Sequence, residues 1–207
     1  MKKIFTTLLF LSGIYSASFA QTKNTTEIGF NVGYSASNIY YSHSDGSNDY
    51  KGGFNTGISL EYYFSDNWGF KGKAIYDQKG WGNATLNFPD GSVYGATVHL
   101  NYLTIPLMAD CHFGRTKNWY LNFGPYVGFL LNANESVNNT DLKGGFNSTD
   151  FGFAAGIGVK FPVSNTVKMF VEIDGQAGLT DIFKENPYSS VQNTRSSINV
   201  GFLIPMK

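Results

Sequence analysis

Apolar residues recur at every second position through most of this chain, from Ile28 to Ile204. A period of two places successive side chains on opposite faces of a β-strand. Eight segments of this kind predict an all-β protein, and closing the sheet into a ring leaves no strand edge exposed to lipid. We therefore expect a single closed eight-stranded antiparallel transmembrane β-barrel. The clearest run has apolar residues at Trp119, Leu121, Phe123, Pro125, Val127, Phe129 and Leu131.

The segments are separated by connections that alternate between short and long. The predicted strands cover about 27–41, 52–64, 68–81, 93–113, 119–133, 150–161, 167–180 and 195–205. The short connections are 65–67, 114–118 and 162–166, and the long ones are 42–51, 82–92, 134–149 and 181–194. Outer-membrane barrels have short periplasmic turns and long extracellular loops. The short turns and both termini are therefore predicted on the periplasmic side.

The alternation also predicts which residues face lipid. The segment 93–113 changes phase, because Val98 and Leu100 are at even positions whereas the apolar residues from Leu103 onward are at odd positions. A phase change within one strand indicates an extra residue, so we predict a β-bulge near Asn101–Leu103. The residues predicted to face outward include Phe30, Leu60, Phe70, Ile105, Val127, Ile157, Val171 and Val200.

Residues 1–20 have the pattern of a secretory signal peptide. Lys2 and Lys3 precede an apolar stretch, and Ser18 and Ala20 are small residues at the positions that a signal peptidase reads. Residues 21–207 would then form the barrel domain, in the cell outer membrane. The remaining 13 basic residues (15 less two) and 15 acidic residues give a net charge of −2, which offers no electrostatic case for binding nucleic acid.

The face opposite the large apolar residues carries many charges. Such charges are untenable in the dry core of a soluble barrel, so they favour a membrane barrel with a polar interior. Pairing across the turn at 65–67 places Glu61 opposite Lys71, and Lys73 is expected to approach Glu172 or Asp174 across the lumen. The predicted lumen charge cluster comprises Glu61, Lys71, Lys73, Asp110, Glu172 and Asp174. Eight strands enclose a space that side chains just fill, so this cluster is predicted to act as a plug. A narrow gated pore for small solutes is the alternative.

Two sequence elements resemble a known family. Residues 101–107 (Asn-Tyr-Leu-Thr-Ile-Pro-Leu), followed by Phe-Gly-Pro-Tyr-Val-Gly at 123–128, are similar to the PorT-like outer-membrane β-barrel family of Bacteroidota. The resemblance covers nearly the whole chain after the predicted signal peptide. It implies an eight-stranded outer-membrane barrel with no established enzymatic role. The chain departs from most such barrels at its end, which reads Pro205-Met206-Lys207 instead of closing on an aromatic residue.

The three histidines define no catalytic or metal site. His43, His99 and His112 show neither a motif that pairs a histidine with a serine nor the spacing of zinc ligands. The glycines at 152, 156 and 158 lie within a predicted strand, which excludes a dinucleotide-binding loop and suggests room for bulky lumen neighbours. We therefore expect no catalytic residue, metal or cofactor.

The resulting prediction is a non-enzymatic barrel, monomeric, with a structural or interaction role through its extracellular loops. Its expected partners are outer-membrane lipid and an unidentified protein or ligand at those loops. An enzyme that modifies outer-membrane lipid is the second alternative.

Overall fold

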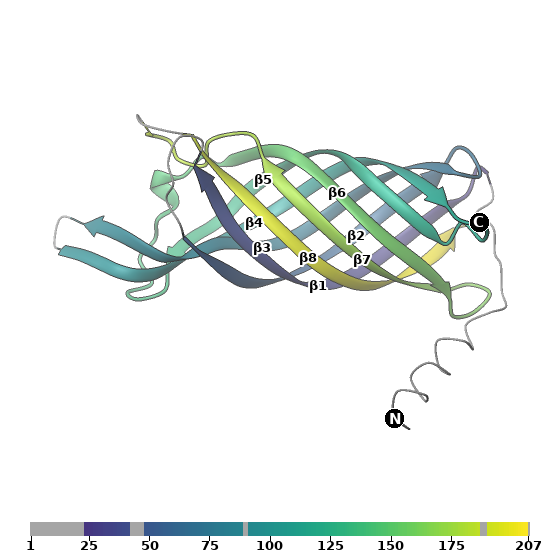
Figure 1. Cartoon of the computed structure of the whole chain (residues 1–207), viewed down its shortest axis with the longest axis horizontal. Helices are drawn as coiled ribbons and strands as arrows, with labels where there is room; N and C mark the ends of the chain where they lie inside the picture. The colour runs from purple at the N-terminus through teal and green to yellow at the C-terminus, as the bar shows by residue number, and fades with distance from the viewer. Residues whose placement is uncertain (1–22, 42–47, 89–90, 187–189, 207) are drawn as a thin grey trace, which may run out of the picture.

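The computed structural model describes residues 23–41, 48–88, 91–186 and 190–206. The predicted signal peptide and His43 lie outside these residues. Eight long strands run side by side and tilt steeply relative to the axis of the molecule (Figure 1). They are β1 Thr26–Tyr41, β2 Asp49–Tyr63, β3 Trp68–Phe88, β4 Gly91–Phe113, β5 Trp119–Glu135, β6 Thr149–Pro162, β7 Lys168–Gly178 and β8 Val191–Met206, with a 3-10 helix, η1, at Lys143–Gly145.

The strands close into one antiparallel ring. Each strand pairs with its sequence neighbours, and β1 also pairs with β8, from Thr26 opposite Met206 to Tyr41 opposite Val191. The ring therefore supplies every strand with two hydrogen-bonded neighbours, which confirms the predicted fold class. In the described part of the chain, no helix is long and apolar enough to cross a membrane.

The side-chain orientation on the barrel wall is also as predicted. Of the eight residues expected to face outward, five are exposed and three are half-buried, with exposed fractions as high as 63% at Phe70. On the opposite face Lys73, Tyr126 and Glu172 are buried and Asp174 is half-buried. The wall is thus apolar outside and polar inside, the arrangement of a barrel whose solvent is lipid.

A break in register occurs at the predicted place, between Asn101 and Tyr102, but the predicted phase change in the fourth strand is wrong. Even positions of β4 face the lumen from Ala96 onward, so Val98 and Leu100 are buried inside the barrel. The extra residue lies in β5 instead, because Asn101 pairs with Asn132 whereas Tyr102 pairs with Leu130. Val98 and Leu100 suggested a change of the outward face because they are apolar. They belong instead to an apolar layer inside the lumen.

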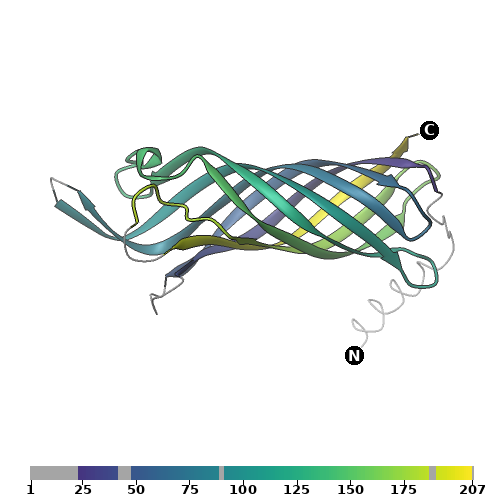
Figure 2. The same cartoon turned by 90° about the horizontal axis from the view of Figure 1, so that it is seen from above.

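The loop predicted at 82–92 is largely strand. β3 and β4 continue as a hairpin that projects beyond the rest of the barrel wall (Figures 1 and 2). Two register shifts interrupt its pairing, around Ala84, and two nearby residues have positive φ, 56° at Asn83 and 67° at Gly95. These bulges break the period of two, which explains why the segment read as a loop.

Inward-facing glycines make room for aromatic rings in the lumen. A Cβ atom added at Gly158 would lie 2.3 Å from Cζ of Tyr120, and one at Gly152 would lie 2.5 Å from Cε1 of Tyr126. Both distances are shorter than any ordinary carbon contact. The glycines therefore accommodate bulky neighbours, as the sequence suggested.

We expect an arginine at Ile157 to destabilise the barrel by roughly 2–4 kcal/mol, because it would place a charge on the lipid face near the middle of β6. The free energy of unfolding in lipid vesicles measures this change. Asn165→Arg, in the exposed turn between β6 and β7, is the control and should have little effect. Equal effects of the two substitutions would contradict the assigned orientation.

Candidate functional site

The short-turn end of the lumen contains an ion-pair network centred on Glu61. The carboxylate of Glu61 lies 3.0 Å from the Nζ atoms of both Lys71 and Lys160, and 2.8 Å from Nε2 of His112. Lys71 also binds Asp110. The exposed fractions of these side chains are 4% or less, so the charges are neutralised by one another and not by bulk water.

Glu27 extends this network towards the end of the barrel. Its two carboxylate oxygens lie 3.2 Å from Nζ of Lys160 and 2.7 Å from Nζ of Lys168. The hydroxyl of Tyr63 also donates a hydrogen bond to Glu27, at 2.7 Å. The last charged side chains before the short turns are therefore all paired.

The expected ion pair between Lys73 and Glu172 is formed. The second carboxylate oxygen of Glu172 accepts hydrogen bonds from the hydroxyl of Tyr120, at 3.0 Å, and from Nδ2 of Asn122, at 2.8 Å. Because β3 and β7 are separated by half the circumference, this contact crosses the lumen and occupies it.

Asp174 has a different partner, Arg195. The Arg195 guanidinium binds Asp174 and also lies 3.0 Å from Asp77. Ser197 and Asn199 donate further hydrogen bonds to Asp174, at 2.9 and 3.0 Å. This second network lies between the Glu61 network and the long-loop end of the lumen.

A third network lies closer to the long loops and is centred on Asp150. Tyr126 and Asn193 donate hydrogen bonds to the same oxygen of Asp150, at 3.1 and 3.0 Å, and Nζ of Lys79 lies 3.5 Å from it. The ammonium group of Lys79 also lies over the rings of Tyr102 and Tyr126. These groups again join opposite sides of the wall.

The inward charges balance. Apart from Glu135, which binds loop backbone, the described wall directs seven acidic and seven basic side chains inward. The acidic residues are Glu27, Glu61, Asp77, Asp110, Asp150, Glu172 and Asp174. The basic residues are Lys51, Lys71, Lys73, Lys79, Lys160, Lys168 and Arg195. An electrically neutral interior of this kind avoids the cost of a buried excess charge.

The six residues of the predicted lumen charge cluster all line this interior, but they are not joined into one cluster. Glu61, Lys71 and Asp110 belong to the Glu61 network, Lys73 and Glu172 pair with each other, and Asp174 binds Arg195. Sequence reasoning missed Glu27, Asp150 and Arg195 as members. They could have been identified from the sequence, because each lies at a position of its strand that the alternation directs into the lumen.

Glu61, Asp110 and His112 lie close enough for a metal site, with one ligand atom from each within 4.8 Å of the others. Lys71 and Lys160 are already bound to these carboxylates. A divalent cation would have to displace or repel both ammonium groups, so the chemistry of the cluster is that of an ion-pair network.

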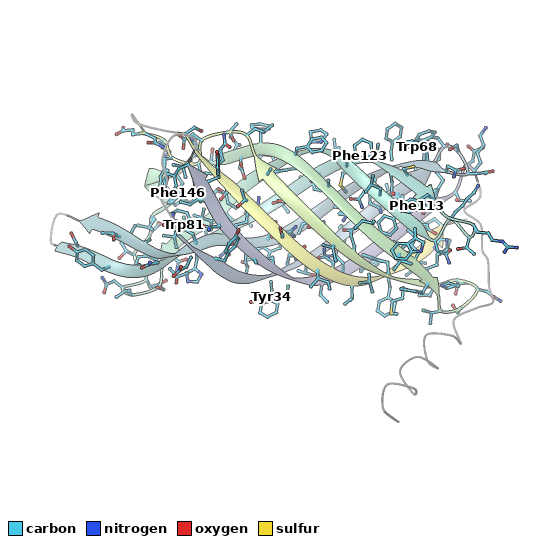
Figure 3. All side chains as sticks on the ribbon, in the orientation of Figure 1. Tyr34, Trp68, Trp81, Phe113, Phe123 and Phe146 are labelled. Carbon is cyan, nitrogen blue, oxygen red and sulfur yellow. The ribbon has the colours of Figure 1, made fainter. Side chains whose placement is uncertain are left out.

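An apolar cap closes the long-loop end of the lumen. Its centre is an aromatic group in which the ring centroids of Trp81 and Phe146 are 6.1 Å apart and those of Phe146 and Phe183 are 4.9 Å apart. Trp81 and Phe146 lie together near the long loops, whereas Trp68 and Phe113 lie at the opposite end of the barrel (Figure 3). The buried residues of the cap are Ile39, Trp81, Ala84, Val98, Leu100, Tyr102, Leu130, Ala133, Phe146, Ile182 and Val191.

Two loops form a lid over this cap. Nδ2 of Asn147, between β5 and β6, donates hydrogen bonds of 2.9 Å to the carbonyl oxygens of Asp181 and Phe183, between β7 and β8. Lys184 in turn binds the carbonyl oxygen of Gly144. The carboxylate of Glu135, at the end of β5, accepts hydrogen bonds from the backbone N–H groups of Asn138 and Thr140, at 2.8 and 3.0 Å. The lid is thus an ordered structure, which the sequence pattern did not predict.

We expect Lys160→Met to destabilise the protein by about 3–5 kcal/mol, because it removes the cation shared by Glu27 and Glu61 from a buried site. Denaturant unfolding in lipid vesicles measures the change. The control is Lys117→Met, since Lys117 is only half-buried and its partner Asp66, at 3.8 Å, is exposed, so this pair should contribute less than ~1 kcal/mol. Similar losses for the two variants would contradict the role of the network.

The fold is shared with solved outer-membrane proteins. OprG from Pseudomonas aeruginosa is 13% identical over 89% of this chain and 97% of its own, with a TM-score of 0.50. Neisserial surface protein A (NspA) is 14% identical over 86% of this chain and 96% of its own, with a TM-score of 0.51. AlkL, solved in DMPC lipid bilayers, is 11% identical over 93% and 95%, with a TM-score of 0.50. At these identities the likeness shows the fold alone.

The family comparison covers most of the sequence. A comparison with curated protein sequences gives no significant match. The model of the family described as outer membrane protein beta-barrel domain matches residues 19–184, about four fifths of the 207 residues. The closed ring, its apolar exterior and this match place the protein in the outer membrane. The chain therefore belongs to the family of outer membrane protein β-barrel domains.

Proposed function

We propose that this protein is a sealed outer-membrane barrel that presents its extracellular loops to a protein or ligand outside the cell. The observation that carries the proposal is the filled lumen: three polar networks cross it and an apolar cap lies above them. Neither seal depends on the other, because one consists of ion pairs and hydrogen bonds and the other of packed aromatic and aliphatic side chains. A barrel whose lumen is blocked at two levels is better suited to presenting its loops to a partner than to transporting solutes.

The long-loop end of the barrel carries exposed apolar side chains suited to binding a partner. Large side chains there are well exposed, including Tyr94 in the β3–β4 hairpin at 75%, Leu179 at 68% and Val137 at 60%. Exposed aromatic and aliphatic residues on an ordered support are typical of surfaces that bind a partner. The lid and the projecting hairpin provide such a support.

The same observations support a non-enzymatic, monomeric protein of the PorT-like group. His112 faces the lumen, where it contacts Glu61 and the carbonyl oxygen of Lys117, so it has no access to a lipid substrate outside the wall. The ring pairs all eight strands within one chain, so a partner chain is not needed to complete the sheet. The elements at 101–107 and 123–128 support the PorT-like assignment.

We expect the wild-type barrel to show no ion conductance above background in planar lipid bilayers. Lys73→Glu alone should stay closed because the cap remains, and Phe146→Ser with Phe183→Ser should stay closed because the ion pairs remain. Combining all three substitutions breaks the contact that crosses the lumen between β3 and β7 and opens the cap above it, and should produce conductance. Lys117→Glu with Val137→Ser, both outside the lumen networks and the cap, is the control. Steady channels in the wild-type protein would overturn the proposal and favour the narrow pore.

The interaction itself is tested with the intact protein in detergent, used as bait for extracellular material. A ligand captured by the wild type should be lost on Tyr94→Ser with Leu179→Ser, because these substitutions remove exposed apolar surface at the long loops. Val163→Ser, at an exposed position in the turn between β6 and β7, is the matched control. If Val163→Ser reduced capture of the ligand as much as Tyr94→Ser with Leu179→Ser, the long loops would not be its binding site.

A further inference from the structure

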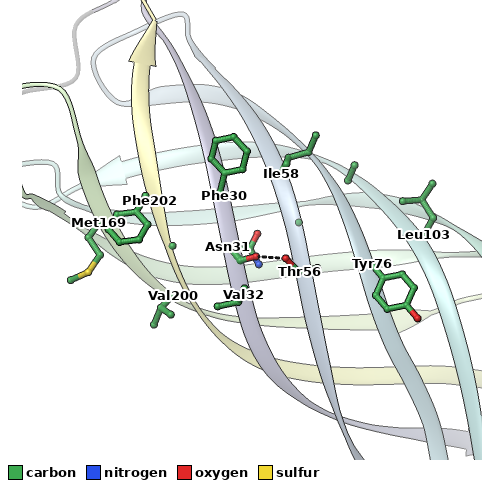
Figure 4. Close-up of a pocket in the computed structure, with 13 residues that line it drawn as sticks. Phe30, Asn31, Val32, Thr56, Ile58, Tyr76, Leu103, Met169, Val200 and Phe202 are labelled. Carbon is green, nitrogen blue, oxygen red and sulfur yellow. Dashed lines mark hydrogen bonds between the residues drawn. The ribbon is translucent and has the colours of Figure 1, made fainter.

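The outer wall carries a groove that crosses six strands. It lies between two rows of outward side chains, and its volume is about 580 Å³. The first row, set by the pairing register, is Met169, Phe202, Phe30, Ile58 and Ala74, and the second is Val200, Val32, Thr56, Tyr76 and Leu103. Figure 4 shows these side chains standing on both sides of a strip of open backbone.

The floor of the groove is backbone whose polar groups are paired. It consists of Gly201, Asn31 and Gly57, each at an inward position of its strand. The side chain of Asn31 points into the lumen, where its Nδ2 atom lies 3.3 Å from Oδ1 of Asn55. The hydroxyl of Thr56 donates a hydrogen bond of 2.9 Å to the carbonyl oxygen of Asn31. The floor therefore offers an apolar surface to its occupant.

The groove has the dimensions of one hydrocarbon chain. Its two rows are two residues apart on each strand, about 6.6–7 Å. From Val200 to Leu103 it makes four of the eight steps around the ring, roughly 19 Å measured along the curved wall, which matches the contour length of a chain of about 16 carbons. Short side chains at Thr56 and Ala74 keep it open between the taller rings of Phe30, Phe202 and Tyr76.

The positions of the two ends of the groove indicate which membrane leaflet supplies the hydrocarbon chain. Met169, at the lower end, is the second residue of β7 and adjoins the short turn to β6. Leu103, at the upper end, lies ten residues above the short-turn end of β4. The groove therefore opens near the predicted periplasmic surface and rises into the bilayer.

We propose that this groove binds one acyl chain of a glycerophospholipid from the periplasmic leaflet. The groove is continuous with the lipid-facing wall, follows the curve of that wall from β7 to β4, and contacts its occupant from below and from both sides. A second copy of the protein would have to insert a ridge of branched side chains, which fits a narrow channel of this kind less well. The acyl chain is thus held at a defined position on the wall.

The test uses native mass spectrometry of the detergent-solubilised barrel titrated with palmitoyl-oleoyl phosphatidylglycerol. The wild type should retain one lipid. Ala74→Phe and Thr56→Phe, each of which fills the groove, should lower the retained fraction about tenfold. Ala109→Phe is the matched control, because Ala109 is a small outward residue of β4 outside the groove. Heat-modified migration in gels checks that each variant is folded.

Three results would overturn the proposal. One is equal retention by the wild type and both groove variants. Another is a wild-type dimer that Ala74→Phe dissociates, since the occupant would then be a second copy. The third is retention of added lipid A in place of the phospholipid, with the same dependence on Ala74, because the chain would then come from the outer leaflet.

Discussion

Closure of the β1–β8 ladder is the constraint on which the rest of this structure depends. A strand edge in hydrocarbon leaves unpaired N–H and C=O groups, each of which costs several kcal/mol, so the first and last strands must find each other. Their pairing extends from Thr26 opposite Met206 to Tyr41 opposite Val191. Once the ring is closed with eight strands, its diameter is fixed, and the space inside is just wide enough for side chains.

That narrow interior explains the chemistry of the lumen. Charged side chains that face inward are removed from bulk water, and each needs a partner of opposite charge or a hydrogen-bonding group. The partners come from distant strands, as in the contact between Lys73 of β3 and Glu172 of β7. The same contacts that satisfy the charges also tie opposite sides of the wall together. Stability and closure of the pore therefore have one physical cause.

The two ends of the lumen are sealed by different forces. Ion pairs and hydrogen bonds close the short-turn half, and their strength depends on geometry and on charge balance. Apolar packing closes the other end, where Trp81, Phe146 and Phe183 meet under the lid. Apart from Tyr102, which contacts both, the two seals consist of different residues, so a substitution at Lys73 or at Phe146 weakens one seal and leaves the other in place. This independence is what makes the combined variant informative.

Period-two alternation determined the strand count, the closed ring and the orientation of the wall, because a lipid solvent enforces one apolar face on every strand. It also indicated the Glu61–Lys71 and Lys73–Glu172 contacts, since adjacent pairing follows from a tight turn and opposite strands of a small barrel face each other. It failed at Val98 and Leu100, which are apolar and yet inward, and at residues 82–92, where bulges interrupt the period. Only the tertiary structure decided that Arg195 binds Asp174, that Phe146 and Phe183 meet over Trp81, and that two outward rows enclose a groove. These contacts join residues far apart in the chain, and no local pattern encodes the height at which one strand faces another.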